Sequence, residues 1–314
     1  MLSNRLVLPV ALTALAPMLW GTTYWTTTRL LLPDHPLTTA TLRALPAGLI
    51  LLAIGHRLPR GDWWWRAALL GALNIAVFFI CLFVAAGRLP GGVAAVVGGI
   101  QPLLVAVLAS VVLAERLTGA VIVAGLAGVA GVALLVTQAR SALDPVGVVA
   151  ALLGAASMAT GTVLTRRWGK DVPPLVLTSW QLLLGGLLLV PITLVVEPLP
   201  AARFSPTAVA GYAYLALLGT AVAYLLWFRG IARLPTRVPA FLGLLSPVVA
   251  LTIGVTMAGE TLAWAQVAGL VLVLGAIAVV IRSATRAVAA DLAEPVGSGP
   301  ERTSWRRATA RRNA

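Results

Sequence analysis

Long apolar stretches, separated by short polar segments, occupy most of the chain. A helix that crosses a ~30 Å hydrocarbon core needs roughly 20 mostly apolar residues, because each residue rises about 1.5 Å. Ten stretches of about this length are present, and no segment between them is long enough to fold alone. They cover residues 8–29, 38–54, 66–86, 91–114, 119–136, 146–165, 175–196, 207–231, 236–258 and 263–281. The pattern therefore predicts ten transmembrane helices.

The backbone has to satisfy its own hydrogen bonds inside a bilayer, so these stretches are either helices or strands of a closed barrel. Barrel strands alternate apolar and polar residues and are about half as long. The stretches here do not alternate, which predicts an all-α integral membrane protein. Composition agrees with this interpretation, because 60% of the residues are hydrophobic, 11% are charged and the mean hydropathy is +0.96.

The distribution of charge adds information on the orientation in the membrane and on the C-terminal segment. The formal net charge is +13, which in a soluble protein would suggest nucleic acid; here the hydropathy excludes that partner and points to the lipid bilayer. The segment 283–314 carries five arginines after residue 301 among Pro, Gly, Ser and Ala. It lacks apolar periodicity, so we expect a disordered basic tail, either solvated or attracted to anionic lipid.

Basic residues in the connecting segments set the orientation. If the N-terminus is cytoplasmic, eleven basic residues precede the tail on the inner side, against four on the outer side. The inner ones are Arg5, Arg57, Arg60, Arg66, Arg116, Arg166, Arg167, Lys170, Arg229, Arg233 and Arg237; the outer ones are Arg29, Arg88, Arg140 and Arg203. The positive-inside rule then predicts cytoplasmic termini and an even helix count. Without a clean small-residue cleavage site, the first stretch is expected to be a retained span. Richness in Ala, Gly, Arg and Pro, with a single lysine, indicates a high-GC bacterial source. A multi-pass protein from such a source is expected in the bacterial plasma membrane.

An internal repeat divides the chain into two halves, 8–137 and 146–282. Arg88-Leu89-Pro90 recurs as Arg233-Leu234-Pro235, Pro102 as Pro247, and Glu115-Arg116-Leu117 as Glu260-Thr261-Leu262, each pair 145 residues apart. Each half has five predicted spans, an odd number, so the second half must be inverted in the membrane relative to the first. Inverted repeats are typical of secondary transporters, whose substrate site lies near the midplane between the halves.

The motifs in these halves resemble a known family. Leu19-Trp20-Gly21-Thr22-Thr23, Thr41-Leu42-Arg43, Pro102 and Glu115-Arg116-Leu117-Thr118, with Thr178-Ser179-Trp180-Gln181 and Pro247 in the second copy, resemble the EamA-type, ten-helix branch of the drug/metabolite transporter superfamily. The resemblance covers residues 8–282 and is closest to the branch with bacterial pigment exporters. It implies alternating-access export of a small organic metabolite, whether amino-acid-like, pigment or drug-like, without naming one.

Two prolines mark a candidate polar patch at membrane depth. Pro102 and Pro247 remove a backbone donor and crowd the carbonyl groups of Gly98 and Gly243, four residues earlier. Gln101 and Ser246 immediately precede the prolines. We expect freed carbonyls and these two side chains to line a central cavity, with the glycines and prolines as kink or gating positions; a kink for packing alone is the alternative.

Arg43 is the one basic residue well inside a predicted span, where insertion costs about 2.5–3.5 kcal/mol. No carboxylate lies within a span to pair with it, so it either contacts an anionic substrate group, backbone carbonyls or water, or extends outward to the interface. Aromatic side chains could supply contact area for the same solute. We single out Trp20, Trp180 and Tyr224 as substrate contacts, against plain packing, and assign Trp63, Trp64 and Trp65 to an interfacial belt.

The fifth and tenth spans are nearly without polar groups. Gly125, Gly128 and Gly131, with Gly269 and Gly275, form small-residue faces that predict scaffold helices, and a possible homodimer contact through either helix. Glu115 and Glu260 precede these spans and are expected to cap them.

Residue types that are rare in the sequence, and motifs that it lacks, narrow its chemistry further. One cysteine and two histidines exclude a disulfide framework and a Cys/His metal cluster, so neither a metal nor a cofactor is expected. No phosphate-binding loop is present, and the coupling ion stays open. A nucleotide-sugar-type exchanger of the same architecture is one alternative. An integral-membrane enzyme is another; it should show clustered His, Asp or Glu, which this chain lacks, so a non-enzymatic function is predicted.

Overall fold

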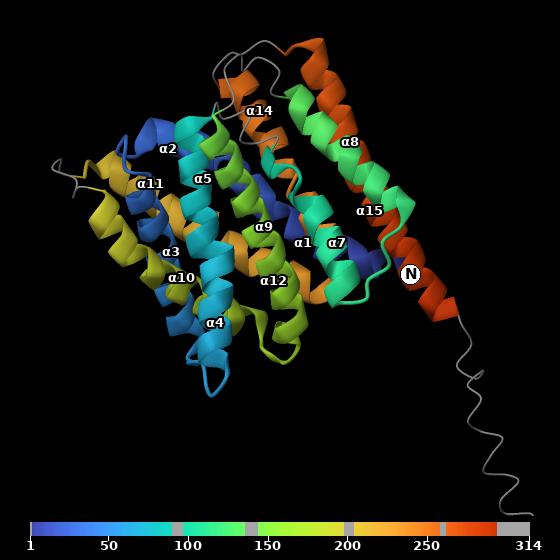
Figure 1. Ribbon diagram of the computed structural model, residues 1–314, viewed down its shortest axis with the longest axis horizontal. Helices are drawn as coiled ribbons and strands as arrows, with labels where there is room; N and C mark the ends of the chain where they lie inside the picture. Colours follow the sequence, from blue (N-terminus) through green and yellow to red (C-terminus); the bar gives the residue numbers. More distant parts are fainter. Residues whose placement is uncertain (1, 90–96, 136–143, 198–203, 258–261, 294–314) are drawn as a thin grey trace, which may run out of the picture.

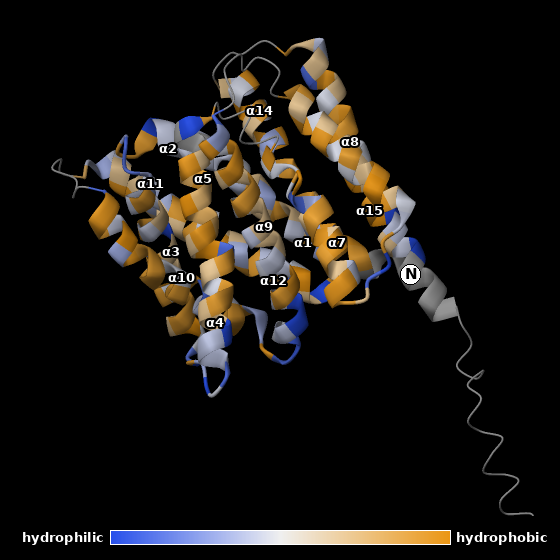
Figure 2. Cartoon of the chain, viewed as in Figure 1, coloured by the Kyte–Doolittle hydropathy of each residue, from blue (hydrophilic) through white to orange (hydrophobic). Residues whose placement is uncertain are grey.

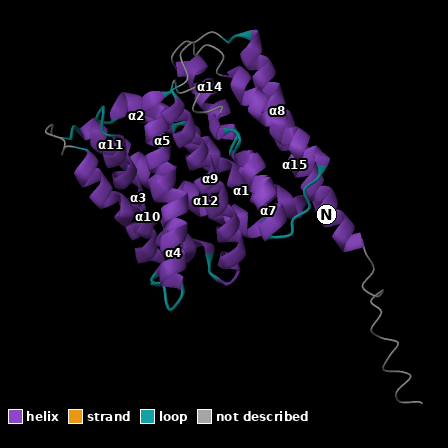
Figure 3. Ribbon diagram, viewed as in Figure 1, coloured by secondary structure: helices purple, strands orange, loops and turns teal. Residues whose placement is uncertain are grey.

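The computed structural model describes residues 2–89, 97–135, 144–197, 204–257 and 262–293. Throughout these ranges the ordered elements are helices, and no strand is present (Figure 3). Eight helical segments in them are long and apolar enough to cross a membrane, and Gln101–Val112 and Gly119–Leu135 are shorter apolar helices. The chain is therefore an all-helical, multi-pass protein, and each of the ten predicted stretches contains a helix.

Several of the predicted stretches are built from more than one helical piece. The first half consists of α1 (Leu2–Gly21), α2 (Thr23–Leu30), α3 (Pro36–Gly55), α4 (Trp63–Gly71), η1 (Ala72–Ala76), α5 (Val77–Arg88), α7 (Gln101–Val112) and α8 (Gly119–Leu135). The second half consists of α9 (Pro145–Trp168), η2 (Gly169–Asp171), α10 (Pro174–Val196), α11 (Pro206–Ala216), η3 (Leu217–Val222), α12 (Ala223–Arg233), α13 (Arg237–Leu242), α14 (Leu245–Met257) and α15 (Trp264–Ala293).

Hydrophobic residues cover the shafts of the helices, and hydrophilic ones gather at their ends (Figure 2). Contacts connect several of the basic residues that were assigned to the inner side. The guanidinium of Arg66 lies 5.9 Å from the ring of Trp168. Arg166, in the last turn of α9, donates to the carbonyls of Ile231 and Ala232 at the end of α12. These basic segments therefore share one end of the helix bundle, here called the basic end.

Glu115 lies between α7 and α8, but it does not cap α8. Its carboxylate accepts hydrogen bonds from the backbone N–H of Thr236 (3.0 Å) and from the Thr236 hydroxyl (2.7 Å). It thus caps the start of α13 in the other half, and the expectation that it caps the fifth span is wrong. Its repeat counterpart, Glu260, lies outside the described residues.

Both third spans of the repeats contain a π-helical segment at the same place. η1 begins at Ala72 and η3 at Leu217, so the two segments start 217 − 72 = 145 residues apart, the spacing of the sequence repeat. A π segment widens the helix by one residue per turn and leaves carbonyl groups less completely bonded, which is why such segments often occur at functional sites. The duplication therefore extends to an irregularity of the backbone.

The proline positions break their spans instead of kinking them. Residues 99–100 form a turn, α7 begins at Gln101, and Pro102 lies in its first turn. In the second half α13 ends at Leu242, residues 243–244 form a turn, and Pro247 lies in the first turn of α14. The expectation of a kink within a continuous helix is therefore wrong, because a proline is tolerated where a helix begins, its missing N–H having no helical partner there.

α3 and α10 cross at a close contact that both halves build in the same way. A methyl group added to Gly48 would lie 2.7 Å from the Cα of Leu183, and one added to Gly186 would lie 2.9 Å from the Cα of Leu45. Gly48 follows Leu45 by three residues, as Gly186 follows Leu183. Such reciprocal contacts are the mark of a two-fold-related interface. Two small residues thus let the backbones approach closely, as in membrane helix pairs generally.

α8 and α15 pack against each other along the edge of the bundle (Figure 1). A methyl group on Gly131 would lie 2.9 Å from the carbonyl oxygen of Gly269. One added to Gly128 would lie 2.8 Å from a methyl carbon of Leu244, whereas Gly275 has no atom within 4 Å of such a group. The glycines of α8 thus serve packing within the chain, and a homodimer through either helix stays a prediction.

The boundary of the basic tail differs from the expectation. α15 continues to Ala293, so residues 283–293 are helical instead of disordered. A run rich in alanine, Ala287 to Ala290 among others, has high helix propensity and extends the last span beyond its apolar part. Residues 294–314 lie outside the described residues.

Candidate functional site

Contacts with α10 hold α3, the helix that carries Arg43, in place. Glu197, at the end of α10, accepts hydrogen bonds from the backbone N–H groups of Leu37 (2.5 Å) and Thr38 (2.8 Å), which satisfies donors that the first turn of a helix leaves free. One turn further, the hydroxyl groups of Thr41 and Thr193 are 2.8 Å apart. α3 is therefore anchored to α10 on the face adjacent to the close glycine crossing.

Arg43 points into the bundle, and its side chain is buried, with 4% exposure. Its Nε donates to the hydroxyl of Thr220 (2.9 Å) and its Nη2 donates to the carbonyl of Gly219 (2.9 Å). Its guanidinium carbon lies 5.1 Å from the ring centre of Phe79, within cation–π distance. The outward-reaching alternative for this side chain is wrong.

The partners of Arg43 belong to the π segment η3, in the other half of the chain. The carbonyl of Gly219 also accepts a hydrogen bond from the indole of Trp20 (3.2 Å), so one backbone oxygen receives donors from α1 and α3. Both partners of the guanidinium are neutral oxygens, and Arg43 forms no ion pair with any residue that the structure describes. Arg43 is therefore a buried cation without a counter-charge among the described residues, which is costly at membrane depth.

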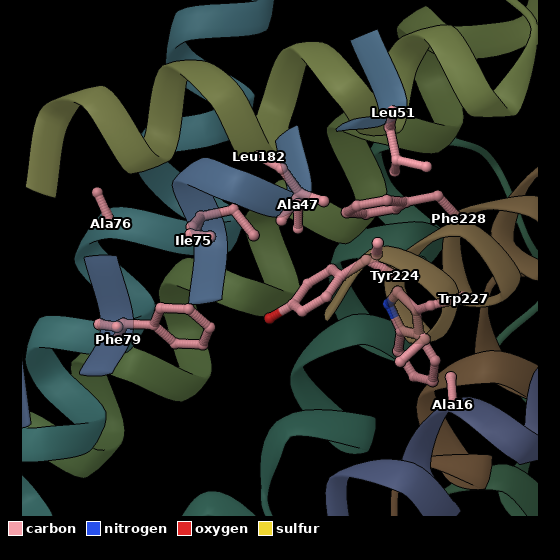
Figure 4. Close-up of a cluster of buried hydrophobic side chains, with 14 of the residues drawn as sticks. Ala16, Ala47, Leu51, Ile75, Ala76, Phe79, Leu182, Tyr224, Trp227 and Phe228 are labelled. Carbon is pink, nitrogen blue, oxygen red and sulfur yellow. The ribbon is translucent and has the colours of Figure 1, made fainter. Parts of the chain in front are cut away.

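Phe79, the ring that Arg43 contacts, belongs to a cluster of buried side chains that includes several other aromatic rings (Figure 4). Trp20 packs against Tyr224 and Trp227, with 5.1 Å between ring centres in both pairs, and Tyr224 packs against Phe228 at 5.8 Å. Figure 4 shows the hydroxyl of Tyr224 directed toward Phe79. The indole N–H of Trp227 is buried and has no hydrogen-bond partner among the residues that the structure describes. Together with Arg43, the rings of Trp20, Tyr224 and Trp227 form what we call the arginine–aromatic site.

Trp180, a third aromatic candidate, lies elsewhere. Its indole donates to the carbonyl of Arg57 (2.6 Å), and its ring lies 5.6 Å from that of Trp63. It packs with Ala67 and Leu70 of α4 in a separate hydrophobic cluster. The structure therefore groups Trp180 with the tryptophans of the interfacial belt and apart from the arginine–aromatic site.

The two helix breaks relate differently to that site. A methyl group on Gly243 would lie 3.7 Å from the ring of Trp227, and one on Gly21, one residue after Trp20, would lie 2.7 Å from the carbonyl oxygen of Ser246. The break before Pro247 thus borders the arginine–aromatic site. In the first half Gln101 and Gly98 are partly exposed, and Gly98 has no atom within 4 Å of an added methyl group. The structure gives no contact between these two residues and the arginine–aromatic site.

A second buried polar centre lies at the repeat-related position. The amide of Asn74, in η1, donates to the side-chain oxygen of Gln181 (2.7 Å) and to the hydroxyl of Thr165 (3.2 Å). Asn74 and Gly219 are 145 residues apart. Gln181 precedes Gly186 on α10 by five residues, as Arg43 precedes Gly48 on α3 by five residues. In each half, a polar residue of the second span therefore contacts the π segment of the other half.

The sequence singled out Arg43, Trp20 and Tyr224, which the structure brings together, but did not draw attention to Gly219, Thr220 and Asn74. The repeat spacing of 145 residues pairs Asn74 with Gly219, so an alignment of the halves would have drawn attention to both. Thr220 interrupts the apolar run of the eighth span, but a lone threonine in such a run is commonplace. Its role becomes visible only when the π segment turns its hydroxyl toward α3.

Known proteins resemble this chain over most of its length. Protein PecM from Dickeya dadantii is 45% identical over 267 residues, which cover 84% of this chain and 89% of that protein. An uncharacterized transporter from Synechocystis is 31% identical and covers 84% of this chain and 87% of its own. The uncharacterized inner membrane transporter YedA of Escherichia coli K12 is 29% identical over 252 residues, with coverages of 78% and 81%.

A solved crystal structure shares the fold with a TM-score of 0.77 and 22% identity, covering 88% of this chain and 98% of that one. The model of the EamA-like transporter family matches residues 8–137 and again residues 145–282. The two matches together include the arginine–aromatic site and its repeat-related centre. This chain belongs to the EamA-like transporter family.

Proposed function

We propose that this transporter exports a small organic metabolite by alternating access, and that Arg43 binds an anionic group of the solute while Trp20 and Tyr224 contact its apolar body. The metabolite is amino-acid-like, a pigment or another drug-like solute. The observation that carries the proposal is the burial of Arg43 without an anionic partner among the described residues. An unpaired charge at membrane depth is costly, and such residues usually mark a substrate pathway.

The hydrogen bonds of Arg43 support this role. A guanidinium has five N–H donors in a planar fork that matches a carboxylate, and the contacts with Gly219 and Thr220 use only two of its three nitrogens. Neutral oxygens hold the side chain in place without neutralising it. An incoming carboxylate would therefore gain a full charge–charge interaction in a site from which water is largely excluded.

The directions of the spans support alternating access between inverted halves. Arg88, at the end of α5, pairs with Asp144 at the start of α9 (3.5 Å), whereas Ala232, near the end of α12, is bound by Arg166 in the last turn of α9. α9 has 24 residues and is about 36 Å long. The corresponding third spans of the two halves therefore end at opposite ends of one membrane-length helix, as inverted repeats require.

Counterflow in proteoliposomes tests the proposal. The purified protein is reconstituted with a panel of labelled amino acids and aromatic carboxylates, and exchange is measured for the wild type and for Arg43→Lys. Lysine keeps the charge but loses the planar fork, so counterflow should fall roughly 10- to 100-fold, the effect of about 1.5–3 kcal/mol of lost charge-assisted hydrogen bonding.

Arg29→Lys, at the exposed end of α2, serves as the matched control and should transport like the wild type. Size-exclusion profiles establish that each variant is folded. Equal counterflow by wild type and well-folded Arg43→Lys would exclude the role of Arg43. A chemically altered product in the vesicles would instead indicate an enzyme.

A further inference from the structure

A cavity at the basic end of the bundle lies one ring away from the arginine–aromatic site. Its volume is about 50 Å³, enough for a few water molecules. The last turn of α9, the turn η2, the start of α10 and the end of α12 line it. Its wall changes from Lys170, which is exposed, to Thr165 and Phe228, which are buried. The cavity therefore leads from the surface into the helix bundle.

Among the described residues, the charged ones that line this cavity are cations. Arg166 and Lys170 belong to its wall, and no Asp or Glu of the described ranges does. A smaller cavity on the other flank of α12 has the same character, because its charged lining residues are Arg229 and Arg233. Walls of one sign of charge raise the local concentration of ions of opposite sign. The cavity is thus suited to attract anions and to repel cations.

Phe228 separates the cavity from the arginine–aromatic site. It belongs to the wall of the cavity, is only 1% exposed, and its ring lies 5.8 Å from that of Tyr224, which in turn contacts Trp20. In Figure 4 Phe228 lies between Leu51 and Tyr224. The ring of Phe228 therefore contacts both the cavity and the ring of Tyr224.

We infer that the cavity is the vestibule through which an anionic solute, a small carboxylate, enters from the basic end, and that Phe228 is the gate between this vestibule and Arg43. The inference rests on the proposed function, because Arg43 is the destination of the carboxylate. It adds a first, weaker binding place, at Lys170 and Arg166, and assigns a gating function to a residue that otherwise belongs to the hydrophobic core.

Cysteine labelling tests the vestibule, and the chain favours it because Cys81 is its single cysteine. On a Cys81→Ser background, Leu177→Cys places a thiol in the cavity wall. It is treated with methanethiosulfonate reagents that carry either a sulfonate or a trimethylammonium group. We expect labelling from the basic end, with the anionic reagent favoured about five-fold or more after correction for the reactivity of each reagent with free thiol.

Two control variants sharpen the charge argument. Lys170→Gln should reduce the preference for the anionic reagent, and Lys170→Arg should retain it. Leu187→Cys, near the middle of α10 and 49% exposed on its apolar surface, should stay unlabelled because a thiol facing lipid does not ionise. Failure of Leu177→Cys to react, or an equal or cationic preference, would overturn the vestibule.

The gate is tested with a thiol beyond it. Ala47 is fully buried in the cluster that includes Phe228, so Ala47→Cys should be unreactive. Phe228→Ala should make it reactive from the basic end, and Phe228→Tyr should leave it protected. A Cys at 47 that stays unreactive in the folded Phe228→Ala variant would overturn the gate. Labelling needs no transport. Normal counterflow by Arg43→Lys would therefore reject the proposed function, and the labelling results would still show whether the cavity is an anion-accessible vestibule.

Discussion

The guanidinium of Arg43 depends on two oxygens that only a distorted helix provides. Gly219 and Thr220 lie in η3, and their carbonyl and hydroxyl oxygens accept from Nη2 and Nε of the arginine, each at 2.9 Å. The carbonyl of Gly219 also accepts from Trp20, so this backbone atom sets the distance between the cation and the aromatic rings. A loss of either oxygen should therefore affect the orientation of Arg43 more than its burial.

The Thr220 hydroxyl can be tested separately. Thr220→Val keeps the shape of the side chain and leaves Nε without an acceptor, which removes a hydrogen bond to a charged group worth about 1.5–3 kcal/mol. We expect kcat/KM for counterflow to fall roughly 10-fold or more. Thr220→Ser retains the hydroxyl and should stay within two- to three-fold of the wild type, on the order of a few tenths of a kcal/mol. A valine variant as active as the serine variant would contradict this positioning role.

Asp144 gives a prediction about pH. Its carboxylate accepts a hydrogen bond from the backbone N–H of Gly147 (3.0 Å) at the start of α9, and this bond, with Arg88 nearby, lowers its pKa below the ordinary value. A carboxyl with a lowered pKa stabilises the fold above its unfolded pKa of about 3.9, and the contribution disappears as the pH falls through the folded value. The thermal midpoint of Asp144→Ala should therefore be below that of the wild type at pH 7.

The difference in midpoint between Asp144→Ala and wild type should narrow as the pH falls below about 4. Asp144→Asn is the control, because asparagine also caps helices but does not titrate in this range. Its midpoint relative to Asp144→Ala should therefore change little with pH. A wild-type advantage that is the same at pH 3 and pH 7 would show that the charge of Asp144 is not involved.

At the scale of the element, close helix approach holds the two halves together at α3 and α10. Gly48→Ala would place a methyl group 2.7 Å from the Cα of Leu183, and backbone on both sides prevents an easy adjustment. Overpacking of this kind costs about 1–3 kcal/mol. We expect a lower thermal midpoint, measured by size exclusion after heating in detergent.

Gly275→Ala is the matched control for this substitution. It lies inside α15, and a methyl group there meets no atom within 4 Å. Alanine is a better helix former than glycine by roughly 0.5–1 kcal/mol, so this variant should be as stable as the wild type or more stable. If Gly48→Ala were equally stable, the close crossing of α3 and α10 would not be a constraint.

The elements also show what the sequence could predict. Apolar length located the helices because lipid imposes it, whereas the odd number of spans per half rests on counting the apolar stretches and stays a prediction. The π segments η1 and η3 could not be predicted, because no residue type requires them; they follow from the packing of the third spans against α3 and α10. Pro102 and Pro247 predicted a disturbance, but whether a proline kinks a helix or lies at its start depends on whether the chain turns just before it, which the proline alone does not decide.

At the scale of the whole molecule, some residues of the candidate site could be predicted from the sequence and others could not. Arg43 stood out because a charge within an apolar run is rare, and Trp20 because it belongs to a recognisable motif. Trp180 looked equivalent by sequence but packs beside Trp63, since the direction of a side chain around a helix depends on contacts that lie far apart in the chain. Long-range geometry, which no local pattern records, separated these candidates.

The proposal that the halves are inverted leads to a topological prediction for residues 88 and 233. Arg88 and Arg233 are repeat equivalents, 145 residues apart, and both are exposed at the last residue of their helices. Arg88 lies beside the start of α9, and Ala232, next to Arg233, lies beside its end. On the Cys81→Ser background, Arg88→Cys should react with an impermeant thiol reagent only in right-side-out vesicles and Arg233→Cys only in inverted ones. Reaction from the same side would mean that the halves are parallel, and alternating access between inverted halves would then have to be abandoned.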